Sequence, residues 1–386
     1  MKPLRDYSFV KGVNGSPRDP QTAERHLGYA KRIGINSVRF WLEPDTYEKD
    51  PQTYVSFIKN FAETCRTNNV TMVPILFNGN MLNPEKLEEA YFPRGEKYCD
   101  DMLRIFQNNE ALLMWDIMNE PACNDYINKD VTEEEQASRL RKLWKFVRHF
   151  CSYIKSKDPV NAITVGHYMT KYLAETADLV DVISYHNYSE TVKGIRTAAE
   201  EALAVGQKYG KPVINNEMSC VARANPYDVT IQIMDSYHIP WYVFCLMIEG
   251  YWGEVHGIFY EDGTVRDPSI PAAITGCFRN RNLETLVPEK PDREAHARNV
   301  IERLKRQLTD SSEDVFAYKE NTKADDLLET MEEAANLLEA GQMVSMRIPP
   351  TARIYAFRKQ KQQNMEELRA YAWELAQMLR SGCHIL

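Results

Sequence analysis

The sequence predicts a closed (β/α)8 barrel followed by a mainly helical C-terminal extension. Short apolar runs alternate with longer amphipathic segments from the start of the chain to about residue 280. Several of the short runs are almost continuously hydrophobic, as strands covered on both faces must be. The 386 residues of the chain also exceed the roughly 250 that one such barrel usually needs. We therefore expect a catalytic barrel over residues 1–285 and a helical extension over residues 286–386.

Eight strand-like runs occur in the barrel region, and each is followed by a segment that can cross back over the sheet. The predicted strands are Tyr7–Gly12, Ser37–Leu42, Val70–Phe77, Leu112–Met118, Ala162–Gly166, Val180–Ser184, Pro212–Asn216 and Trp241–Met247. Apolar residues recur at helical spacing in the clearest intervening segments, which are Thr22–Arg32, Tyr54–Asn68, Thr132–Lys157 and Thr191–Tyr209. An open doubly wound sheet is the competing architecture. It is disfavoured because the first turn, over residues 13–17, has no GxGxxG motif.

Three charged amphipathic segments dominate the C-terminal extension: Glu294–Leu308, Ala324–Leu338 and Met365–Leu379. Between them we expect a short strand at Ala352–Phe357 and a turn at Lys319–Lys323. Apolar stripes of this kind indicate packing rather than chemistry. The predicted helices therefore pack on the barrel or on a second subunit, and a scaffolding role or a homo-oligomer formed through them stays open.

The composition of the chain argues against several classes of partner. There are 47 Lys and Arg against 55 Asp and Glu, a formal net charge of −8, which gives no electrostatic reason to bind nucleic acid or an anionic membrane. No apolar run approaches the ~20 residues of a membrane span. The eight cysteines form no CxxC pair, which is typical of buried thiols in a reduced compartment. Because the N-terminus has no apolar signal region, we expect a cytoplasmic protein.

Two glutamates directly follow the fourth and seventh predicted strands. Catalytic residues of a (β/α)8 barrel lie at the carboxyl ends of its strands, so Glu120 and Glu217 should face each other across the barrel mouth. Retaining hydrolysis of a glycosidic bond requires two carboxyl groups roughly 5–5.5 Å apart. We expect Glu217 to be the nucleophile and Glu120 the acid/base. The charge of Glu217 should then raise the pKa of Glu120.

The segments around both glutamates resemble those of clan A glycoside hydrolases, above all family 5. Leu113–Pro121 is similar to the acid/base strand of that family, and Lys211–Glu217 is similar to its nucleophile strand. The resemblance implies that Arg39 steadies the nucleophile and that Asn119 binds the sugar 2-hydroxyl. The segment His186–Tyr188 matches the family's His-x-Tyr motif, which implies a histidine near the acid/base and a tyrosine hydroxyl near the nucleophile. These ordered matches span about residues 7–280.

Two strand ends depart from the family pattern. Strand eight commonly ends in a tryptophan beneath the −1 sugar, whereas this chain has Leu246–Glu249 in that region. Trp252 is then the expected sugar platform, and Trp241 is the alternative. Strand three often ends in a histidine, whereas this one ends in Phe77–Asn80. These differences leave catalysis intact but the sugar specificity open.

Some candidate residues have equally plain structural interpretations. Glu249 either binds sugar hydroxyls or forms a loop salt bridge, Arg39 has a structural salt bridge as its alternative, and His186 has a place in the core. Further candidates for lining the cleft follow predicted strands: Tyr91, Phe92, Trp41 and Glu43. The histidines are scattered, with no helical i, i+4 pair for zinc, and no GxSxG elbow occurs. We expect neither a metal nor another cofactor.

The residues together predict double-displacement hydrolysis of a short β-linked oligosaccharide. The segment Arg39–Tyr47 and the missing leader resemble cytoplasmic β-mannosidases of family 5 more than secreted cellulases. That resemblance implies an exo-acting enzyme that releases mannose. Two alternatives remain: an endo-β-glucanase acting on cello-oligomers, and a carbohydrate-binding barrel that no longer turns over substrate.

Overall fold

The computed structural model describes most of the chain, namely residues 4–276, 293–309, 317–341, 349–360 and 364–382. Contacts divide the chain into two compact units, Met1–Ile274 and Thr275–Leu386. The predicted boundary at residues 285 and 286 falls within residues 277–292, which lie outside the described residues. Each unit has a hydrophobic core of its own.

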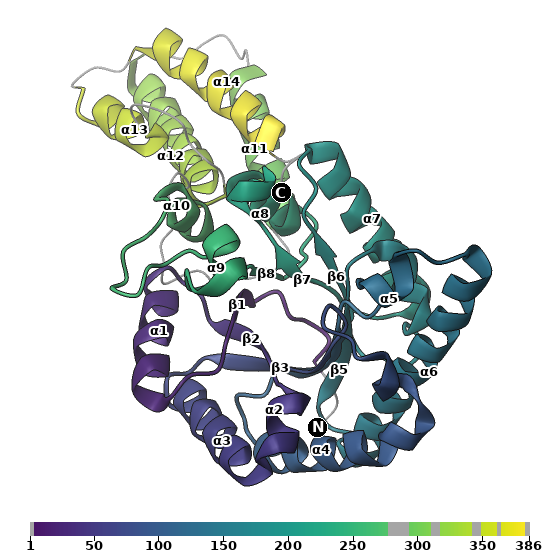
Figure 1. Cartoon of the computed structure of the whole chain (residues 1–386). Helices are drawn as coiled ribbons and strands as arrows, with labels where there is room; N and C mark the ends of the chain where they lie inside the picture. The colour runs from purple at the N-terminus through teal and green to yellow at the C-terminus, as the bar shows by residue number, and fades with distance from the viewer. Residues whose placement is uncertain (1–3, 277–292, 310–316, 342–348, 361–363, 383–386) are drawn as a thin grey trace. The chain divides into compact units, whose positions relative to one another are not determined.

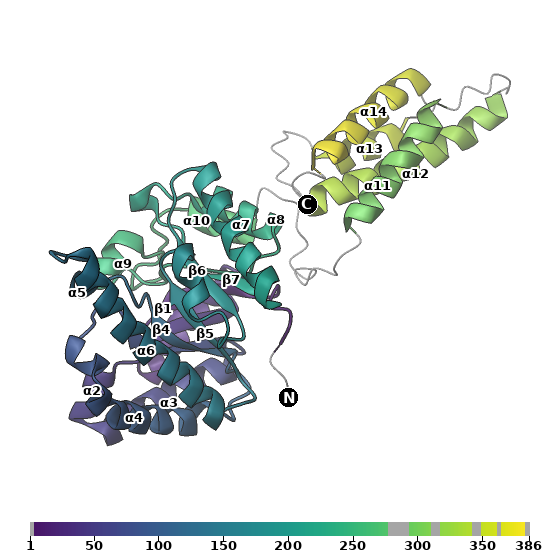
Figure 2. The ribbon, with the colours of Figure 1, turned by 90° about the vertical axis from the view of Figure 1, so that its right-hand side faces the viewer.

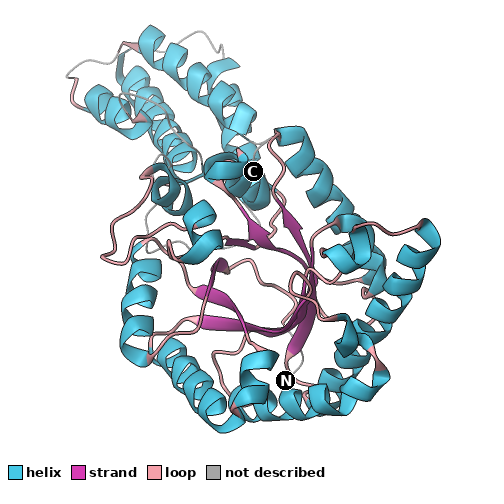
Figure 3. Cartoon of the chain, viewed as in Figure 1, coloured by secondary structure: helices cyan, strands magenta, loops and turns pink. Residues whose placement is uncertain are grey.

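The first unit is a closed barrel of eight parallel strands that neighbour one another in chain order, so the predicted fold is confirmed. The strands are β1 (Lys11–Gly15), β2 (Ser37–Trp41), β3 (Thr71–Asn78), β4 (Met114–Asn119), β5 (Ala162–His167), β6 (Ile183–Asn187), β7 (Val213–Met218) and β8 (Trp241–Val243). Pairing of β1 with both β2 and β8 closes the ring. Figures 1 and 3 show this ring with the helices around its outside.

Helices connect the strands on the outside of the barrel. Its α-helices are α1 (Pro20–Arg32), α2 (Pro44–Lys49), α3 (Pro51–Thr67), α4 (Phe92–Phe106), α5 (Asp125–Asn128), α6 (Glu133–Lys157), α7 (Val192–Tyr209), α8 (Tyr227–Ser236), α9 (Gly250–His256) and α10 (Ser269–Thr275). The short 3-10 helices are η1 (Pro84–Leu87), η2 (Glu89–Tyr91), η3 (Thr170–Glu175) and η4 (Val221–Arg223). Local signals set several ends: Thr132 and Glu135 form a capping box at the start of α6, and Gly210 ends α7 with a φ of 65°. All four predicted barrel helices are present.

The N-terminal end of the barrel is filled by an apolar plug that lies inside the ring. It consists of Tyr7, Val10, Val73, Leu113, Met114, Ala162, Val182, Ile214 and Tyr242. Tyr7 and Val10 were predicted to lie in the first strand, which begins only at Lys11; they belong to the plug because both side chains are buried there. A plugged base leaves the carboxyl ends of the strands as the end that can hold a site.

The second unit consists of four helices, α11 (Arg293–Thr309), α12 (Ala317–Gly341), α13 (Pro350–Arg358) and α14 (Met365–Gly382). Figure 2 shows α11, α12 and α14 side by side. The three predicted amphipathic helices are confirmed, and their apolar faces pack on one another around Leu304, Met331 and Leu375. Packing of this unit on the barrel or on a partner stays a prediction. Within the described residues, no helix is both long enough and apolar enough to cross a bilayer.

Two local predictions in the second unit are wrong. The segment Ala352–Phe357 is helical and lies within α13, not in a strand. Its buried residues Ile354 and Phe357 both face the core of the unit, and a spacing of three brings two side chains to one side of a helix but to opposite sides of a strand. The predicted turn at Lys319–Lys323 lies within the long helix α12.

Candidate active site

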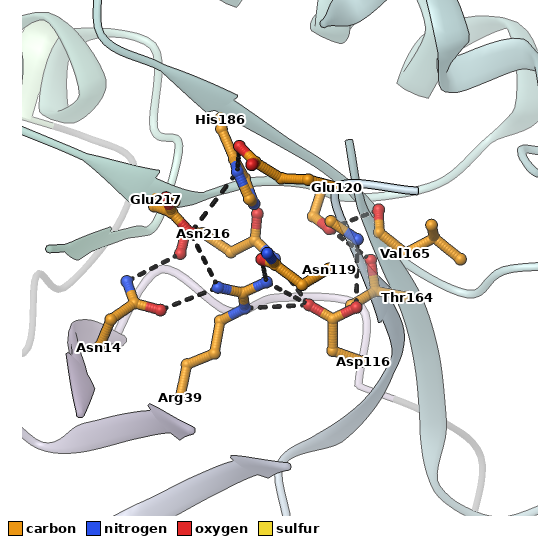
Figure 4. Close-up of polar contacts among 12 residues, drawn as sticks. Asn14, Arg39, Asp116, Asn119, Glu120, Thr164, Val165, His186, Asn216 and Glu217 are labelled. Atoms are coloured by element: carbon orange, nitrogen blue, oxygen red, sulfur yellow. Dashed lines mark hydrogen bonds and ion pairs between the residues drawn. The ribbon is translucent and has the colours of Figure 1, made fainter. Parts of the chain in front are cut away.

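Polar side chains gather at the carboxyl ends of the barrel strands, opposite the apolar plug. Figure 4 shows that they converge from several strands on one point. The central group consists of Asn14 from β1, Arg39 from β2, Asp116 and Asn119 from β4, His186 from β6 and Glu217 from β7, with Glu120 directly after β4. The structure thus brings together five of the six residues that the sequence placed nearest the chemistry and adds Asn14 and Asp116; the sixth, Tyr188, contacts Glu217.

Arg39 is the hub of this group and is completely buried, with 0% of its surface exposed. Its Nε donates to Asp116 Oδ2 at 2.9 Å, and its Nη2 donates to Asn119 Oδ1 at 2.7 Å. Its Nη1 donates to Asn14 Oδ1 at 2.8 Å and to Glu217 Oε2 at 3.2 Å. A buried cation is tolerated only when its donors are satisfied in this way. The planar guanidinium therefore holds several side chains in fixed relative positions.

Asp116 supplies the compensating negative charge. Besides Arg39, it accepts hydrogen bonds from Asn216 Nδ2 at 3.1 Å and from the backbone N–H of Gly166 at 3.1 Å. The sequence reasoning missed Asp116, although a carboxylate inside the apolar run Trp115–Ile117 is a signal, because burying it is costly unless it is paired. It also missed Asn14, which lies in a segment interpreted only as a turn.

The two glutamates share one gap. Glu217 Oε1 accepts a hydrogen bond from the Tyr188 hydroxyl at 3.0 Å, and its Oε2 contacts Arg39. Glu120 Oε1 lies 2.7 Å from His186 Nδ1, and its Oε2 accepts from Asn80 Nδ2 at 2.7 Å. One carboxylate oxygen of Glu120 lies within 4.8 Å of one of Glu217. This separation matches the roughly 5–5.5 Å of paired carboxyls in retaining glycosidases rather than the wider pair of inverting ones.

The backbone around Glu120 is held in an unusual conformation. Glu120 has a φ of 44°, in the left-handed region that residues with a side chain rarely adopt. Its N–H donates to Gly166 O at 2.7 Å, and the N–H of Gly79 donates to Asn119 O at 2.7 Å. A Cβ at Gly79 would lie 2.2 Å from the carbonyl oxygen of Glu120. The chain therefore needs glycine at position 79 for the β3 and β4 ends to approach each other.

The protonation order of the free site differs from the one predicted. Burial raises the pKa of Glu120, but the hydrogen bond and charge of His186, together with the Asn80 amide and the charge of Arg39, lower it to about 2. Burial raises the pKa of Glu217, which the charge of Glu120 raises further and His186 partly opposes. The predicted rise in the pKa of Glu120 is therefore wrong for the free site, because the contacts of Glu120 with His186 and Asn80 lower the pKa by more than burial raises it.

A cavity of about 1240 Å³ opens over both glutamates, which is ample for a short oligosaccharide. Among the predicted cleft residues, Trp41 and Glu43 lie on its wall. The prediction for Tyr91 and Phe92 is wrong, because only 7% and 8% of their surfaces are exposed and both pack in the barrel core instead.

The aromatic wall of the cavity differs in part from the predicted one. Trp252, on α9, lies on the wall with 53% of its surface exposed. The alternative platform Trp241 is excluded, because it is buried within β8. Phe244, which the sequence reasoning missed, also lies on the wall directly after β8. Its ring packs edge to face against the rings of Trp41 and His256, with distances of 5.7 and 4.8 Å between the ring centroids. Knowing that β8 ends at Val243 would have pointed to it.

Two groups of side chains have the chemistry of metal ligands among the described residues: Glu120, His186 and Glu217, and separately His26, Glu249 and Glu261. In the first group, Arg39 contacts Glu217. In the second, Glu249 pairs with Arg18 and Glu261 pairs with Arg25. Three of these four carboxylates therefore already accept from guanidinium donors, and the fourth, Glu120, contacts His186 and Asn80 instead. For Glu249, which also lies on the cavity wall, the structure thus contains the predicted loop salt bridge.

Comparisons with known proteins identify a family and a relative that this chain is similar to. The model of the cellulase family (glycosyl hydrolase family 5) matches residues 7–250. A mannan endo-1,4-β-mannosidase of Mytilus edulis is 27% identical over 224 residues, which cover 48% of this chain and 58% of that enzyme. The chain thus spans less than two thirds of the length of this curated relative.

Solved structures share the barrel at low sequence identity. The endo-1,4-β-mannanase of Rhizomucor miehei superposes with a TM-score of 0.56 at 14% identity, over 69% of this chain and 93% of that one. A variant of GH5_18 from Streptomyces cattleya, in complex with Manβ1-4GlcNAc, superposes with a TM-score of 0.56 at 12% identity, over 72% and 81%. At such identities the likeness demonstrates the fold.

Proposed function

The chain belongs to glycosyl hydrolase family 5, and from this premise we propose that it hydrolyses a short β-mannoside with retention, releasing mannose from one end. The observation that carries the proposal is the pair of carboxyl groups at the ends of β4 and β7, with oxygens within 4.8 Å of each other. A gap of this width admits an anomeric carbon but leaves no room for the extra water of the inverting mechanism.

In the first step, a carboxylate oxygen of Glu217 forms a bond to the anomeric carbon. The bond from that carbon to the leaving oxygen breaks, and the leaving oxygen takes the proton of Glu120. Arg39 and the Tyr188 hydroxyl hold one oxygen of Glu217 each, at 3.2 and 3.0 Å. They keep the carboxylate oriented for attack and stabilise its negative charge before the sugar binds.

His186 Nδ1 lies 2.7 Å from Glu120 Oε1 and holds that oxygen in place. In the free site this contact outweighs the effect of burial and lowers the pKa of Glu120 to about 2, so Glu120 is ionised there. A bound sugar excludes water from the gap, and desolvation disfavours the ionised carboxylate. The pKa of Glu120 therefore rises when the sugar binds, and Glu120 takes up the proton that it then gives to the leaving oxygen.

In the second step, water hydrolyses the glycosyl ester. Glu120, now ionised, takes a proton from the water, whose oxygen bonds to the anomeric carbon as the bond to Glu217 breaks. Both glutamates return to their starting states, and the sugar keeps its β configuration. Asn119, held by Arg39 at 2.7 Å, is the group we assign to the sugar 2-hydroxyl, and Trp252 and Phe244 supply aromatic surface for sugar rings.

The choice of mannose rests on similarity. The curated relative is a mannan endo-1,4-β-mannosidase, and the GH5_18 structure holds Manβ1-4GlcNAc, a short β-mannoside. The disaccharide supports exo-action on a small substrate, whereas the relative's name supports endo-action. The six cysteines that the structure describes are free thiols, which supports the proposed reducing, cytoplasmic location.

A substrate panel tests this function. The protein is incubated with aryl β-mannoside, Manβ1-4GlcNAc, β-mannopentaose and cello-oligomers, and the products are followed by chromatography and proton NMR. We expect mannose to appear first, as the β-anomer. Internal cleavage of mannopentaose would replace exo-action by endo-action, and cleavage of cello-oligomers alone would favour the endo-glucanase. No hydrolysis of any β-mannoside would reject the proposal.

A mechanism-based inactivator separates an enzyme from a silent binding protein. An activated 2-deoxy-2-fluoro-mannoside forms the ester with the nucleophile but hydrolyses slowly, so the adduct accumulates. We expect mass spectrometry of peptides to place it on Glu217. Tight binding of the sugar without any adduct would instead favour the carbohydrate-binding alternative.

A further inference from the structure

A chain of hydrogen bonds runs from Arg39 to Glu120, and its direction is fixed by chemistry. A guanidinium only donates hydrogen bonds, so the Asn119 atom that lies 2.7 Å from Arg39 Nη2 is the oxygen Oδ1. The other amide atom of Asn119, Nδ2, donates to Asn80 Oδ1 at 2.7 Å. Asn80 is therefore left with Nδ2 towards Glu120 Oε2, also at 2.7 Å. Each amide orientation follows from the one before it.

This chain connects the two carboxyl groups of the site. Arg39 Nη1 contacts Glu217 Oε2 at 3.2 Å, so the connection runs from Glu217 through Arg39, Asn119 and Asn80 to Glu120. Turning over the amide of Asn80 would set N–H against N–H at Asn119 and oxygen against oxygen at Glu120. Both hydrogen bonds would be lost together, and the polar atoms would be left opposed. In this arrangement Asn80 presents a donor to one oxygen of Glu120.

We propose that Asn80 is a positioning residue that decides which oxygen of Glu120 carries the proton given to the leaving group. The amide N–H of Asn80 can only donate to Oε2, whereas a ring nitrogen such as His186 Nδ1, 2.7 Å from Oε1, can either donate or accept. The proton of a neutral Glu120 therefore lies on Oε1. Oε2 then only accepts the hydrogen bond of Asn80, and Oε1 is the oxygen that delivers the proton to the leaving group. This inference rests on the proposed function and names a further residue for the same reaction.

Contacts with neighbouring strands hold the loop that carries Asn80 in place. Asn80 lies just after β3, next to Gly79, whose N–H is bonded to Asn119 O at 2.7 Å. The loop is thereby fastened to the end of β4. Asn80 is exposed and lies on the cavity wall. Titratable and charged groups from several elements face Glu120, namely Arg39, Cys123, Tyr168, His186, Tyr188 and Glu217. Among the described residues, the neutral amide donor to Glu120 is Asn80.

Two glycosides of one sugar provide the test. One has a sugar or alkyl leaving group, which needs a proton, and the other has 2,4-dinitrophenolate, which leaves without one. We expect Asn80→Ala to lower kcat/KM for the first by about tenfold or more, since general acid catalysis contributes at least that much. For the dinitrophenyl glycoside, kcat/KM should change by no more than about twofold. An equal loss on both substrates, or no loss on either, overturns the proposal.

The pH dependence gives a second readout. Asn80→Asp replaces the donor by a carboxylate that faces Glu120 Oε2, so the pKa of Glu120 rises. Because Glu120 takes up its proton when the sugar binds, the basic limb of kcat should then move to higher pH by about one unit or more, and an unchanged limb contradicts the inference. Asn69→Asp is the matched control, because it adds the same charge just before the other end of β3, where Asn69 has a φ of 56° that Asp tolerates. It should leave the limb in place.

A direct titration separates this inference from the proposed function. Carbon NMR of labelled glutamate carboxyl groups, with Glu120→Gln for assignment, follows Glu120 in the wild type and in Asn80→Asp without substrate. A higher pKa in the variant supports the role of Asn80 even if no glycoside on the panel is cleaved. Equal titration curves reject it even if the wild type is an active β-mannosidase.

Discussion

Both ends of the barrel contain buried side chains, but these side chains are held together by different interactions. At the base, apolar side chains such as Val73, Met114 and Ile214 pack into one plug. At the mouth, the buried groups are charged or polar. Arg39 there donates directional hydrogen bonds to Asp116, Asn14, Glu217 and Asn119. Packing tolerates changes of shape better than a buried charge tolerates loss of its partner. Stability and chemistry are therefore separated along the same strands.

The sharpest test of this comparison is Glu217→Gln, which keeps the size of the side chain and removes the nucleophile. We expect kcat on a cleaved glycoside to fall by at least about 10⁴-fold, as for other lost nucleophiles. The melting temperature should stay the same or rise, because burial raises the pKa of Glu217 and its ionised form is costly in the fold. A modest loss of activity would remove Glu217 from the mechanism.

Arg39→Met should damage both stability and activity. The change leaves Asp116 and Glu217 as buried carboxylates without their guanidinium partner. We expect the free energy of unfolding to fall by about 3–5 kcal/mol and activity to be lost. Urea unfolding measures the first effect and the glycoside assay the second. Arg39→Lys is the control, since it keeps the charge but not the fork of donors, and a stable, active Met variant would contradict the role of the hub.

Ile214→Ala tests the base of the barrel on the strand that carries Glu217. Ile214 is completely buried in the plug, so its truncation should lower the free energy of unfolding by about 2–5 kcal/mol. We expect kcat/KM of the folded variant to stay within about twofold of the wild type, because no polar contact of the mouth is removed. If kcat/KM fell as steeply as stability, the two ends would not be independent.

The smallest predicted effect is the pH dependence of stability at Glu120. Its pKa is about 2 in the folded protein, compared with an ordinary value of 4.5. A lowered folded pKa contributes stability that is present above the unfolded pKa and is lost as the pH falls through the folded one. Glu120→Gln should therefore cost on the order of 1–3 kcal/mol near neutral pH. The difference from the wild type should shrink between pH 4.5 and about 2, as measured by urea unfolding across that range.

Most of the fold could be predicted from the sequence, because local patterns of apolar residues indicate the strands and helices. Apolar runs such as Val70–Phe77 and helical stripes such as Thr132–Lys157 need only neighbouring residues to be recognised. The wrong assignments occurred where local pattern and packing disagree. Ala352–Phe357 has β-forming residues but contributes Ile354 and Phe357 to a helical core. Tyr7 and Val10 look like strand residues but plug the barrel base.

The residues missed at the site share one property, which is that their partners lie far away along the chain. Asn14 contacts Arg39, and Asn80 contacts Glu120. Neither asparagine forms part of a motif. Asn80 was noticed only as part of the strand end Phe77–Asn80, where the family often has a histidine, and Asn14 only as part of a turn. Phe244 was missed for a different reason, because the end of β8 was placed too late. Sequence patterns indicate which positions lie at strand ends, but not which of them meet.

The sequence by itself determined the order of strands and helices and placed a glutamate at the end of each of two opposite strands, because those features depend on neighbouring side chains. Only the tertiary structure decided the distance between Glu120 and Glu217 and the order in which they hold protons. Both depend on residues from β1, β2, β4, β6 and β7 and from the loop after β3. Closure of the barrel brings these residues within hydrogen-bonding distance of one another. Electrostatic energies fall with distance in space, not along the chain.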